Sequence, residues 1–336
     1  MNTSRVTIRV VAQEAGVSVT TVSHALNGKG KVSFATAERV RLVAEQLGYR
    51  PSATAQALRT GRTGAIALVL PQENPEAARG LLALDYYMQI AATAASTAFD
   101  HNRPLILPPA ISTAEDWARI NPDGVLLCDP VENDPRIDLL ESSGIPVVTI
   151  ERDSGRPDWP YYVSGDNVAN TREVLDHLRA AGARRVALLT TDWSRAWAHD
   201  IEDAYGQWCQ ENGQDEVRAT VPMRIEVRDA FGPAAALLDS ANPPDAFYAP
   251  AEGYSTGVVK ACAERGLRIP DDVLLVCGND SRESRQSDPP ITAVDLRPQQ
   301  QTAAAIKLLI ARISGLDVTA PVIVSSQLNV RASTTR

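Results

Sequence analysis

The sequence predicts an α/β protein in which a small all-α segment precedes a larger body of two parallel sheets flanked by helices. From residue 63 onward, short β-branched runs alternate with helical patterns, as in parallel sheets whose strands are joined by helical crossovers. Before residue 63 the apolar residues recur mainly at helical spacing. A chain of 336 residues is long enough for two or three domains.

Charge is divided unequally along the chain. Residues 1–62 hold nine Lys and Arg against three acidic residues, a net charge of +6. The rest of the chain then carries −14, because the formal charge of the whole chain is −8. A basic segment joined to an acidic body is expected where one end of a protein meets DNA. Chance clustering of surface charges is the alternative explanation.

Residues 1–50 carry the pattern of three short helices. The predicted N-caps are Thr7, Ser18 and Ser33, and the predicted stops are Gly16 and Gly48. The apolar faces are Ile8, Val11, Ala12 and Ala15; then Val22, Ala25 and Leu26; then Ala37, Val40, Ala44 and Leu47. The first two helices are joined by a Gly-containing turn, and small polar residues face outward on the second. This is the helix-turn-helix arrangement that lays its second helix in the major groove. A three-helix scaffold that binds something else is the alternative.

Four motifs in this region occur in order: AxxAGVSxxTVSxxLN, VSxxTxxRV, LGYxPxxxAxxL and TGxIAL. Together they resemble the amino-terminal region of the lactose/galactose repressor (LacI) family of bacterial transcriptional regulators. A weaker resemblance continues to the final LNVRAST. The resemblance implies a homodimeric repressor that places two headpieces on a pseudo-palindromic operator in double-stranded DNA. It also implies control by a small-molecule effector bound in the larger core.

The resemblance implies DNA contacts residue by residue. Val19 and Thr20 match the base-reading pair at the start of the recognition helix, and His24 stands where the family usually has a base-contacting Arg. Positions that match phosphate or base contacts are Thr7, Ser18, Ser23, Asn27 and Lys31. Val19 as a core residue and Ser18 as a simple cap are the alternatives. Val10 replaces the family's common Asp and is given no role.

Residues 51–62 form the predicted hinge. The stretch from Ser52 to Leu58 is too short to be a stable helix alone, so we expect it to fold on DNA beside its dimer mate. The resemblance implies DNA contacts by Ser52 and Ala53, and insertion of Leu58 between base pairs in the minor groove. An ordinary linker hydrophobe is the alternative role of Leu58.

The acidic body, residues 63–336, contains two series of predicted strands. The first series is 66–70, 105–107, 124–128 and 146–150, and the second is 186–190, 246–249 and 273–277. We therefore expect lobe 1 at about 63–162 and 291–320, and lobe 2 at about 163–290 and 321–336. A last strand is expected at 322–330. The resemblance implies a fold like that of periplasmic sugar-binding proteins, with ligand in the cleft at the carboxyl ends of the strands.

Strand ends and the resemblance together indicate the effector-binding residues: Pro71, Glu151, Trp193, Arg195, Trp197, Glu252 and Asn279. A Trp face can stack on a sugar or a base, although packing between the lobes would also explain Trp193 and Trp197. Three positions depart from the family. Ile201 replaces an Arg that clamps sugar hydroxyls, Ala251-Glu252 replaces Asn-Asp, and Asn279 replaces Asp. These departures leave a sugar-like and an anionic effector open.

Other classes of function lack their motifs. No GxGxxG follows a strand, and the GKGK segment lacks the strand and the Ser/Thr of a phosphate loop, so we expect neither an enzyme nor a cofactor. The histidines and cysteines are scattered, which predicts neither a metal site nor a disulfide: His24, His101, His177 and His199, and Cys128, Cys209, Cys262 and Cys277.

The sequence also predicts where the protein works and how it associates. MNTSRVTIRV has no apolar signal core, and no apolar run reaches the roughly 18 residues of a membrane helix. We therefore expect a cytoplasmic protein with no membrane partner. The terminal STTR follows no leucine heptad, which favours a dimer over a tetramer. The alternative function is a free-standing small-molecule binding protein, which the body alone would favour.

Overall fold

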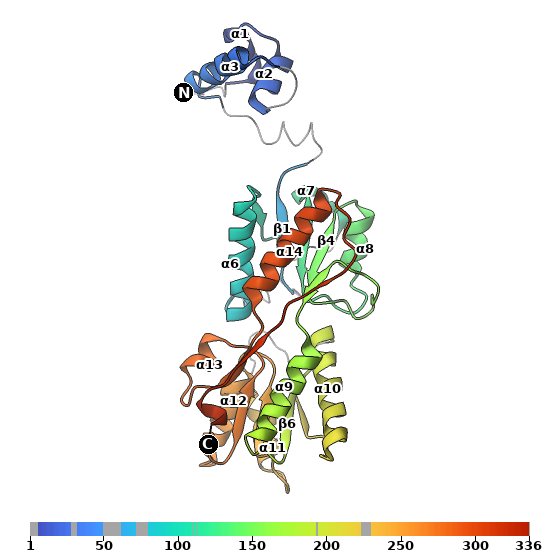
Figure 1. The fold of residues 1–336 in the computed structure, drawn as a ribbon, viewed down its shortest axis with the longest axis vertical. Helices are drawn as coiled ribbons and strands as arrows, with labels where there is room; N and C mark the ends of the chain where they lie inside the picture. The colour runs from blue at the N-terminus through green and yellow to red at the C-terminus, as the bar shows by residue number, and fades with distance from the viewer. Residues whose placement is uncertain are drawn as a thin grey trace. The chain divides into compact units, whose positions relative to one another are not determined.

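Figure 1 shows a computed structural model of the chain. It describes residues 6–27, 32–49, 62–71, 80–109, 111, 113–192, 194–222 and 230–335. The chain divides into two compact units, Met1–Thr63 and Gly64–Arg336. The α/β class predicted from the sequence is confirmed, since the first unit is helical where it is described and the second is built on two sheets.

The smaller unit holds the helices α1 (Ile8–Glu14), α2 (Val19–Asn27) and α3 (Phe34–Gln46). Their apolar faces meet in one small core of Val11, Ala12, Ala15, Val22, Ala25, Val40 and Ala44. Gly16 and Gly48 follow α1 and α3 with φ of +62° and +63°, a backbone region that favours glycine. The three predicted helices and their two glycine stops are therefore present.

Two of the three predicted side-chain caps of these helices are present, and one is not. The Ser18 hydroxyl accepts from the Thr21 amide at 3.0 Å, and the Ser33 hydroxyl accepts from the Thr36 amide at 3.3 Å. Thr7 precedes α1 but makes no side-chain cap hydrogen bond. Its backbone carbonyl alone accepts amides of the first turn, so the expected hydroxyl cap at Thr7 is corrected.

Lobe 1 is built on a six-stranded parallel sheet in the order β11-β5-β4-β3-β1-β2. Its strands are β1 (Ile66–Val69), β2 (Leu105–Ile106), β3 (Gly124–Cys128), β4 (Val147–Ile150), β5 (Tyr162–Ser164) and β11 (Val322–Ile323). Its helices are α6 (Asp85–Asp100), α7 (Ala114–Ile120), α8 (Pro135–Ser142) and α14 (Pro298–Ile313). Successive strand residues point to opposite faces, so Ile66 and Leu68 pack with α6 and α14 while Ala67 and Val69 pack with α7 and α8 (Figure 1).

Lobe 2 repeats this architecture in the order β12-β10-β9-β8-β6-β7. Its strands are β6 (Val186–Thr191), β7 (Arg218–Val221), β8 (Ala246–Ala249), β9 (Leu274–Cys277), β10 (Thr292–Asp295) and β12 (Gln327–Asn329). Its helices are α9 (Asn167–Ala180), α10 (Ala196–Asn212), α11 (Phe231–Leu238), α12 (Tyr254–Glu264) and α13 (Arg282–Gln286), and a 3-10 turn, η1, spans Ala332–Thr334. Helices α9 and α10 cover one face of the sheet, and α11 and α12 cover the other. Only β12 is antiparallel to its neighbour among the described strands.

The chain passes between the lobes three times: after β5, between β10 and α14, and between β11 and β12. The expected lobe boundaries are therefore corrected at two strands: β10 was expected in lobe 1 and pairs in the sheet of lobe 2, and β11 was expected in lobe 2 and pairs in the sheet of lobe 1. The single strand expected at 322–330 is two short strands in different sheets, because residues 324–326 carry the chain from one lobe to the other. Among the described residues, no helix is long and apolar enough to cross a bilayer.

Candidate functional site

The predicted recognition helix α2 has one face in the core and one face exposed. Val22 and Ala25 are buried, whereas Val19 is 42% exposed and Thr20 is exposed. Ser23 and His24 are half-buried. The alternative that Val19 belongs to the core therefore does not apply, and Val19, Thr20 and His24 lie on the part of α2 that the core leaves uncovered.

The other predicted DNA contacts fall into two groups. Thr7 and Ser18 are exposed. The Ser18 hydroxyl is hydrogen-bonded to the hydroxyl and the backbone amide of Thr21, so Ser18 caps the start of α2. The side chain of Asn27 and residues Lys31, Ser52, Ala53 and Leu58 lie outside the described residues.

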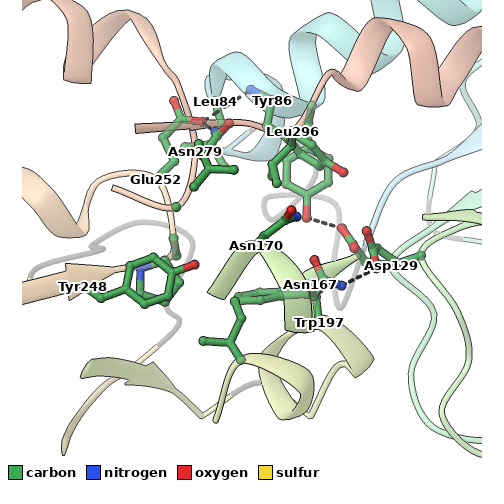
Figure 2. A pocket seen from close by; sticks show the side chains of 17 residues that line it. Leu84, Tyr86, Asp129, Asn167, Asn170, Trp197, Tyr248, Glu252, Asn279 and Leu296 are labelled. Atoms are coloured by element: carbon green, nitrogen blue, oxygen red, sulfur yellow. Dashed lines mark hydrogen bonds between the residues drawn. The ribbon is translucent and has the colours of Figure 1, made fainter. Parts of the chain in front are cut away.

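A pocket lies between the two lobes of the larger unit, at the carboxyl ends of β3, β4, β8 and β9 (Figure 2). It encloses about 750 Å³ of space, including space open to solvent. Its lining residues are Leu84, Tyr86, Tyr87, Asp129, Glu151, Asn167, Asn170, Trp197, Ile201, Tyr248, Pro250, Ala251, Glu252, Gly278, Asn279, Val294 and Leu296. Parallel strands bring their loops together at this edge, which is where α/β folds commonly bind ligands.

Two buried carboxyl groups follow neighbouring strands at one end of the pocket. Asp129 follows β3 with φ +46°, and Glu151 follows β4 with φ +69°. Left-handed backbone is unfavourable for residues with a side chain and collects at functional sites. The Tyr87 hydroxyl donates to Asp129 Oδ2 at 2.5 Å, and the Asn167 amide of lobe 2 donates to Glu151 Oε2 at 3.1 Å. The Glu151 carboxyl of lobe 1 is therefore held by an amide of lobe 2.

Burial, and then the negative charge of Asp129, raise the pKa of Glu151 from its usual value near 4.5 to about 8. The hydrogen bond from Asn167 lowers the pKa but does not offset burial, and Asp200 adds a further increase. Burial, and then Asp129 and Glu151, also raise the pKa of Tyr86 well above its ordinary value. At neutral pH, Glu151 is mainly protonated, so its carboxyl group can donate as well as accept a hydrogen bond.

The middle of the pocket is aromatic and apolar. Tyr86 and Tyr87 lie edge to face with ring centroids 5.2 Å apart, and Trp197 and Tyr248 face the pocket from lobe 2 (Figure 2). Ile201, where the family usually has an Arg, is 7% exposed and adds an apolar contact. Such surfaces pack against the C–H groups of a sugar ring or against another flat ligand.

The opposite end of the pocket is occupied by contacts between the lobes. Glu252 accepts from the backbone amides of Asp85 at 2.9 Å and Tyr86 at 3.4 Å, and Asn279 Nδ2 donates to Glu252 Oε2 at 3.0 Å. In return, the Asp85 carboxylate accepts from the backbone amide of Arg282 and from the Arg285 guanidinium. Asp85 begins α6 in lobe 1 and Arg282 begins α13 in lobe 2. Each helix N-terminus is therefore capped by a carboxylate of the other lobe, an arrangement that we call the reciprocal cap.

The sequence-predicted effector residues are only partly brought together. Glu151, Trp197, Glu252 and Asn279 line the pocket. Arg195 is 5% exposed, and its backbone forms an isolated β-bridge with Val131, so it lies outside the pocket lining. Pro71 is buried at the end of β1 and also lies outside the lining, and Trp193 falls outside the described residues.

Several lining residues were missed by sequence reasoning: Tyr86, Tyr87, Asn167, Asn170 and Tyr248. Asp129 directly follows a predicted strand, and that position alone predicts its place in the cleft. Asn167 and Asn170 are three residues apart at the start of the helix that follows the first crossing, a spacing that puts both on one helix face. Tyr86 and Tyr87 carry no comparable signal, because their place depends on how α6 packs.

Of the two effector classes that the sequence leaves open, the charge of the lining argues against the anionic one. Asp129, Glu151 and Glu252 are carboxyl groups, and none of the described lining residues is Lys or Arg. An anion placed here would meet acidic groups without a compensating positive charge.

Comparisons with known proteins agree with both halves of this arrangement. Residues 7–52 match the family described as "Bacterial regulatory proteins, lacI family", and residues 175–334 match a "Periplasmic binding protein-like domain". The HTH-type transcriptional regulator CelR of Thermobifida fusca is 30% identical over 98% of both chains. The chain belongs to the lacI family of bacterial regulatory proteins.

Other relatives of this regulator agree with that assignment. The HTH-type transcriptional repressor PurR of Haemophilus influenzae (strain PittEE) is 26% identical over 93% of this chain and 92% of its own. The solved complex of CelR with cellobiose matches with a TM-score of 0.73 at 26% identity, over 98% of this chain and all of that one. The lac repressor dimer bound to operator and the anti-inducer ONPF matches with a TM-score of 0.83 at 22% identity, over 99% of this chain and all of that one. These relatives are transcriptional regulators rather than enzymes, and this chain is a helix-turn-helix DNA-binding regulator.

Proposed function

We propose that this regulator represses transcription as a homodimer on a pseudo-palindromic operator, and that a neutral carbohydrate bound between the lobes controls its affinity for DNA. The observation that carries the proposal is the pocket at the carboxyl ends of the strands, lined by aromatic rings, carboxyl groups and amides from both lobes. The protein acts through binding rather than catalysis. Val19, Thr20 and His24 read bases in this proposal, and Leu58 enters the minor groove.

The chemistry of the lining favours a neutral polyhydroxylated ligand. Carboxyl and amide groups can exchange hydrogen bonds with hydroxyls that both donate and accept. The aromatic rings of Tyr86 and Trp197 line the pocket, and such rings can pack against the apolar side of a sugar. CelR, the relative solved with cellobiose, makes that disaccharide the first compound to test.

An organic cation is a second candidate, because three carboxyl groups and four aromatic rings also suit an ammonium group. Against it, the pKa of Glu151 is raised to about 8, so that this carboxyl group is mainly neutral at pH 7. A free-standing binding protein is disfavoured by the helix-turn-helix unit at residues 6–49.

Control of DNA binding follows from how the chain is connected. Residues 51–62 join the headpiece to β1 of lobe 1. A ligand that changes how the two lobes sit in each subunit would change the separation of the two hinges in the dimer. Such coupling is typically about 1–3 kcal/mol.

The test has two stages. The purified full-length protein selects duplexes from a random pool at moderate salt, and a palindromic motif of about 14–20 base pairs is expected, since half-sites lie one or two helical turns apart. Binding to that duplex is then titrated with cellobiose, maltose, glucose 6-phosphate and spermidine. Salt-sensitive binding without a sequence motif would contradict specific recognition of an operator. A response to glucose 6-phosphate alone or to spermidine alone would contradict the proposal that the effector is a neutral carbohydrate.

A further inference from the structure

We infer that Asn170 binds the ligand directly, through a side-chain amide that donates a hydrogen bond to an oxygen of the bound carbohydrate. The inference rests on the proposed function and names a specificity-determining residue within it. It depends on three observations: the place of Asn170 in the pocket, the fixed orientation of its amide, and a buried donor that has no partner.

Asn170 lies in the second turn of α9, just after the first crossing between the lobes. The residue is 9% exposed and lines the pocket. In Figure 2 it projects toward the middle of the ring of lining side chains, with Tyr248 on one side and Asp129 on the other. A polar residue at so buried a position is unusual unless its hydrogen-bonding groups are satisfied.

One half of the Asn170 amide is satisfied and the other is not. The Ser326 hydroxyl, on the crossing between β11 and β12, donates to Asn170 Oδ1. Asn170 Nδ2 is buried and has no hydrogen-bond partner among the described residues. Because Ser326 holds the oxygen, the orientation of the amide is fixed and its N–H groups remain available for another acceptor.

The side-chain amide of Asn167, unlike that of Asn170, uses its N–H group within the protein. Asn167, one turn earlier on α9, already donates to Glu151 at 3.1 Å. Gly165 packs close to the Asn170 amide, since a Cβ built at Gly165 would lie in van der Waals contact with Nδ2, at 3.5 Å. Asn170 and Glu151 line the same pocket, so one sugar could accept a hydrogen bond from the Asn170 amide and exchange one with the Glu151 carboxyl group.

A buried water is the competing explanation. Gln301 Oε1 also lacks a partner among the described residues, and a Cβ at Gly165 would lie 3.7 Å from Gln301 Nε2. A water that joins Asn170 to Gln301 would satisfy both groups without any ligand. The experiment must therefore distinguish a group that contacts the ligand from a group that only supports the fold.

Isothermal titration of the full-length protein with cellobiose supplies the first measurement. Asn170→Leu removes the amide at similar volume, and Asn170→Asp keeps an acceptor for Ser326 but loses the donor. We expect each variant to weaken binding at least about tenfold, and Ser326→Ala, which frees the amide to rotate, to weaken it less. Asn242→Asp, the same change at an exposed residue, is the matched control and should bind within about twofold of the unmodified protein.

The series of monodeoxy cellobioses supplies the second measurement. If Asn170 donates to one hydroxyl, removing that hydroxyl weakens binding to the unmodified protein but makes no further difference to Asn170→Leu. Equal weakening of all analogues by Asn170→Leu would instead indicate the structural water and would overturn the inference. Unchanged affinity of both Asn170 variants would overturn it as well, while leaving the proposed function intact. Failure of the unmodified protein to bind any neutral sugar would overturn both.

Discussion

At the scale of single residues, Glu151 is the group whose ionisation the fold controls most clearly. Glu151 is 6% exposed and follows β4 with a left-handed backbone conformation. Burial, and then Asp129, raise its pKa to about 8, whereas the unfolded chain leaves it near 4.5. The folded state therefore binds a proton that the unfolded state has released, and stability falls as pH rises between these two values.

This difference gives a prediction for the free energy of unfolding. The contribution of Glu151 should be complete below about pH 4.5 and lost progressively up to about pH 8, with a slope of at most about 1.4 kcal/mol per pH unit. Glu151→Gln keeps the shape and cannot ionise, so its stability should depend less on pH over this range. Urea denaturation at pH 5.5 and 7.5 measures both proteins. Parallel pH profiles for the two would contradict the raised pKa.

The exposed face of α2 gives a second prediction at this scale. Thr20 is exposed and His24 is half-buried, and we propose that both side chains contact base edges. A good base contact contributes about 1–3 kcal/mol of discrimination. Thr20→Ala and His24→Ala should therefore weaken binding to the selected operator about tenfold and leave binding to a scrambled duplex nearly unchanged. Fluorescence anisotropy at one salt concentration measures both, and an equal loss on both duplexes would indicate phosphate contacts instead.

At the scale of elements, the reciprocal cap joins two helices of different lobes. The residue before α6 is Leu84, which has no side-chain oxygen to cap the helix, so Glu252 of lobe 2 serves that role. The Asp85 carboxylate of lobe 1 accepts a hydrogen bond from the first backbone amide of α13, that of Arg282. The Ala251-Glu252 departure from the family thus has a structural consequence, because Glu252 holds the lobes together at the end of the pocket opposite Glu151.

Removing this contact should loosen both helix ends. We expect Glu252→Gln to speed hydrogen exchange of the Asp85 and Tyr86 amides, and Asp85→Asn to speed exchange of the Arg282 amide. Loss of a helix cap usually lowers the free energy of unfolding by about 1 kcal/mol. Because the amide oxygen that each substitution introduces can still accept a hydrogen bond, we expect these variants to lose less than that. Glu115→Gln, on the exposed first turn of α7, is the matched control. Unchanged exchange in both variants would show that the lobes are held elsewhere.

The elements that the sequence predicted well are those whose apolar residues repeat. The strand β8 has its predicted bounds, and the buried strands β3 and β6 differ by at most one residue from prediction. The edge strand β7 was missed because Arg218 and Thr220 break its apolar run, which an edge position permits. The split of residues 322–330 between two sheets was also missed, since strand partners depend on the tertiary fold. For the same reason Glu151 and Trp197 could be proposed from strand ends, but Tyr86 and Asn170 could not.

At the scale of the whole molecule, the hinge connects the two functions. Leu58 lies outside the described residues, and its proposed insertion between base pairs rests on the resemblance of the LGYxPxxxAxxL motif to the family. An inserted apolar side chain offsets an unstacking cost of a few kcal/mol by bending the duplex onto more protein surface. Leu58→Ala should therefore weaken operator binding at least tenfold in a gel-shift titration and leave the urea midpoint of the core unchanged. If Leu58→Ala bound the operator as tightly as the unmodified protein does, Leu58 would not be a DNA contact.

Control by an effector makes a thermodynamic prediction that holds whether the effector releases or recruits DNA. If cellobiose, or another sugar that binds, changes operator affinity by some factor, then operator DNA must change the affinity for that sugar by the same factor. A factor between about 5 and 150 corresponds to the usual 1–3 kcal/mol of coupling. Sugar titrations with and without saturating operator, and operator titrations with and without saturating sugar, give the two factors independently. The Asn170→Leu variant should need more sugar to reach the same limiting factor, because it changes affinity in the pocket rather than the connection to DNA. Unequal factors in the unmodified protein would mean that sugar and operator do not act on one common equilibrium, and the interlobe pocket would then lose its proposed role in regulation.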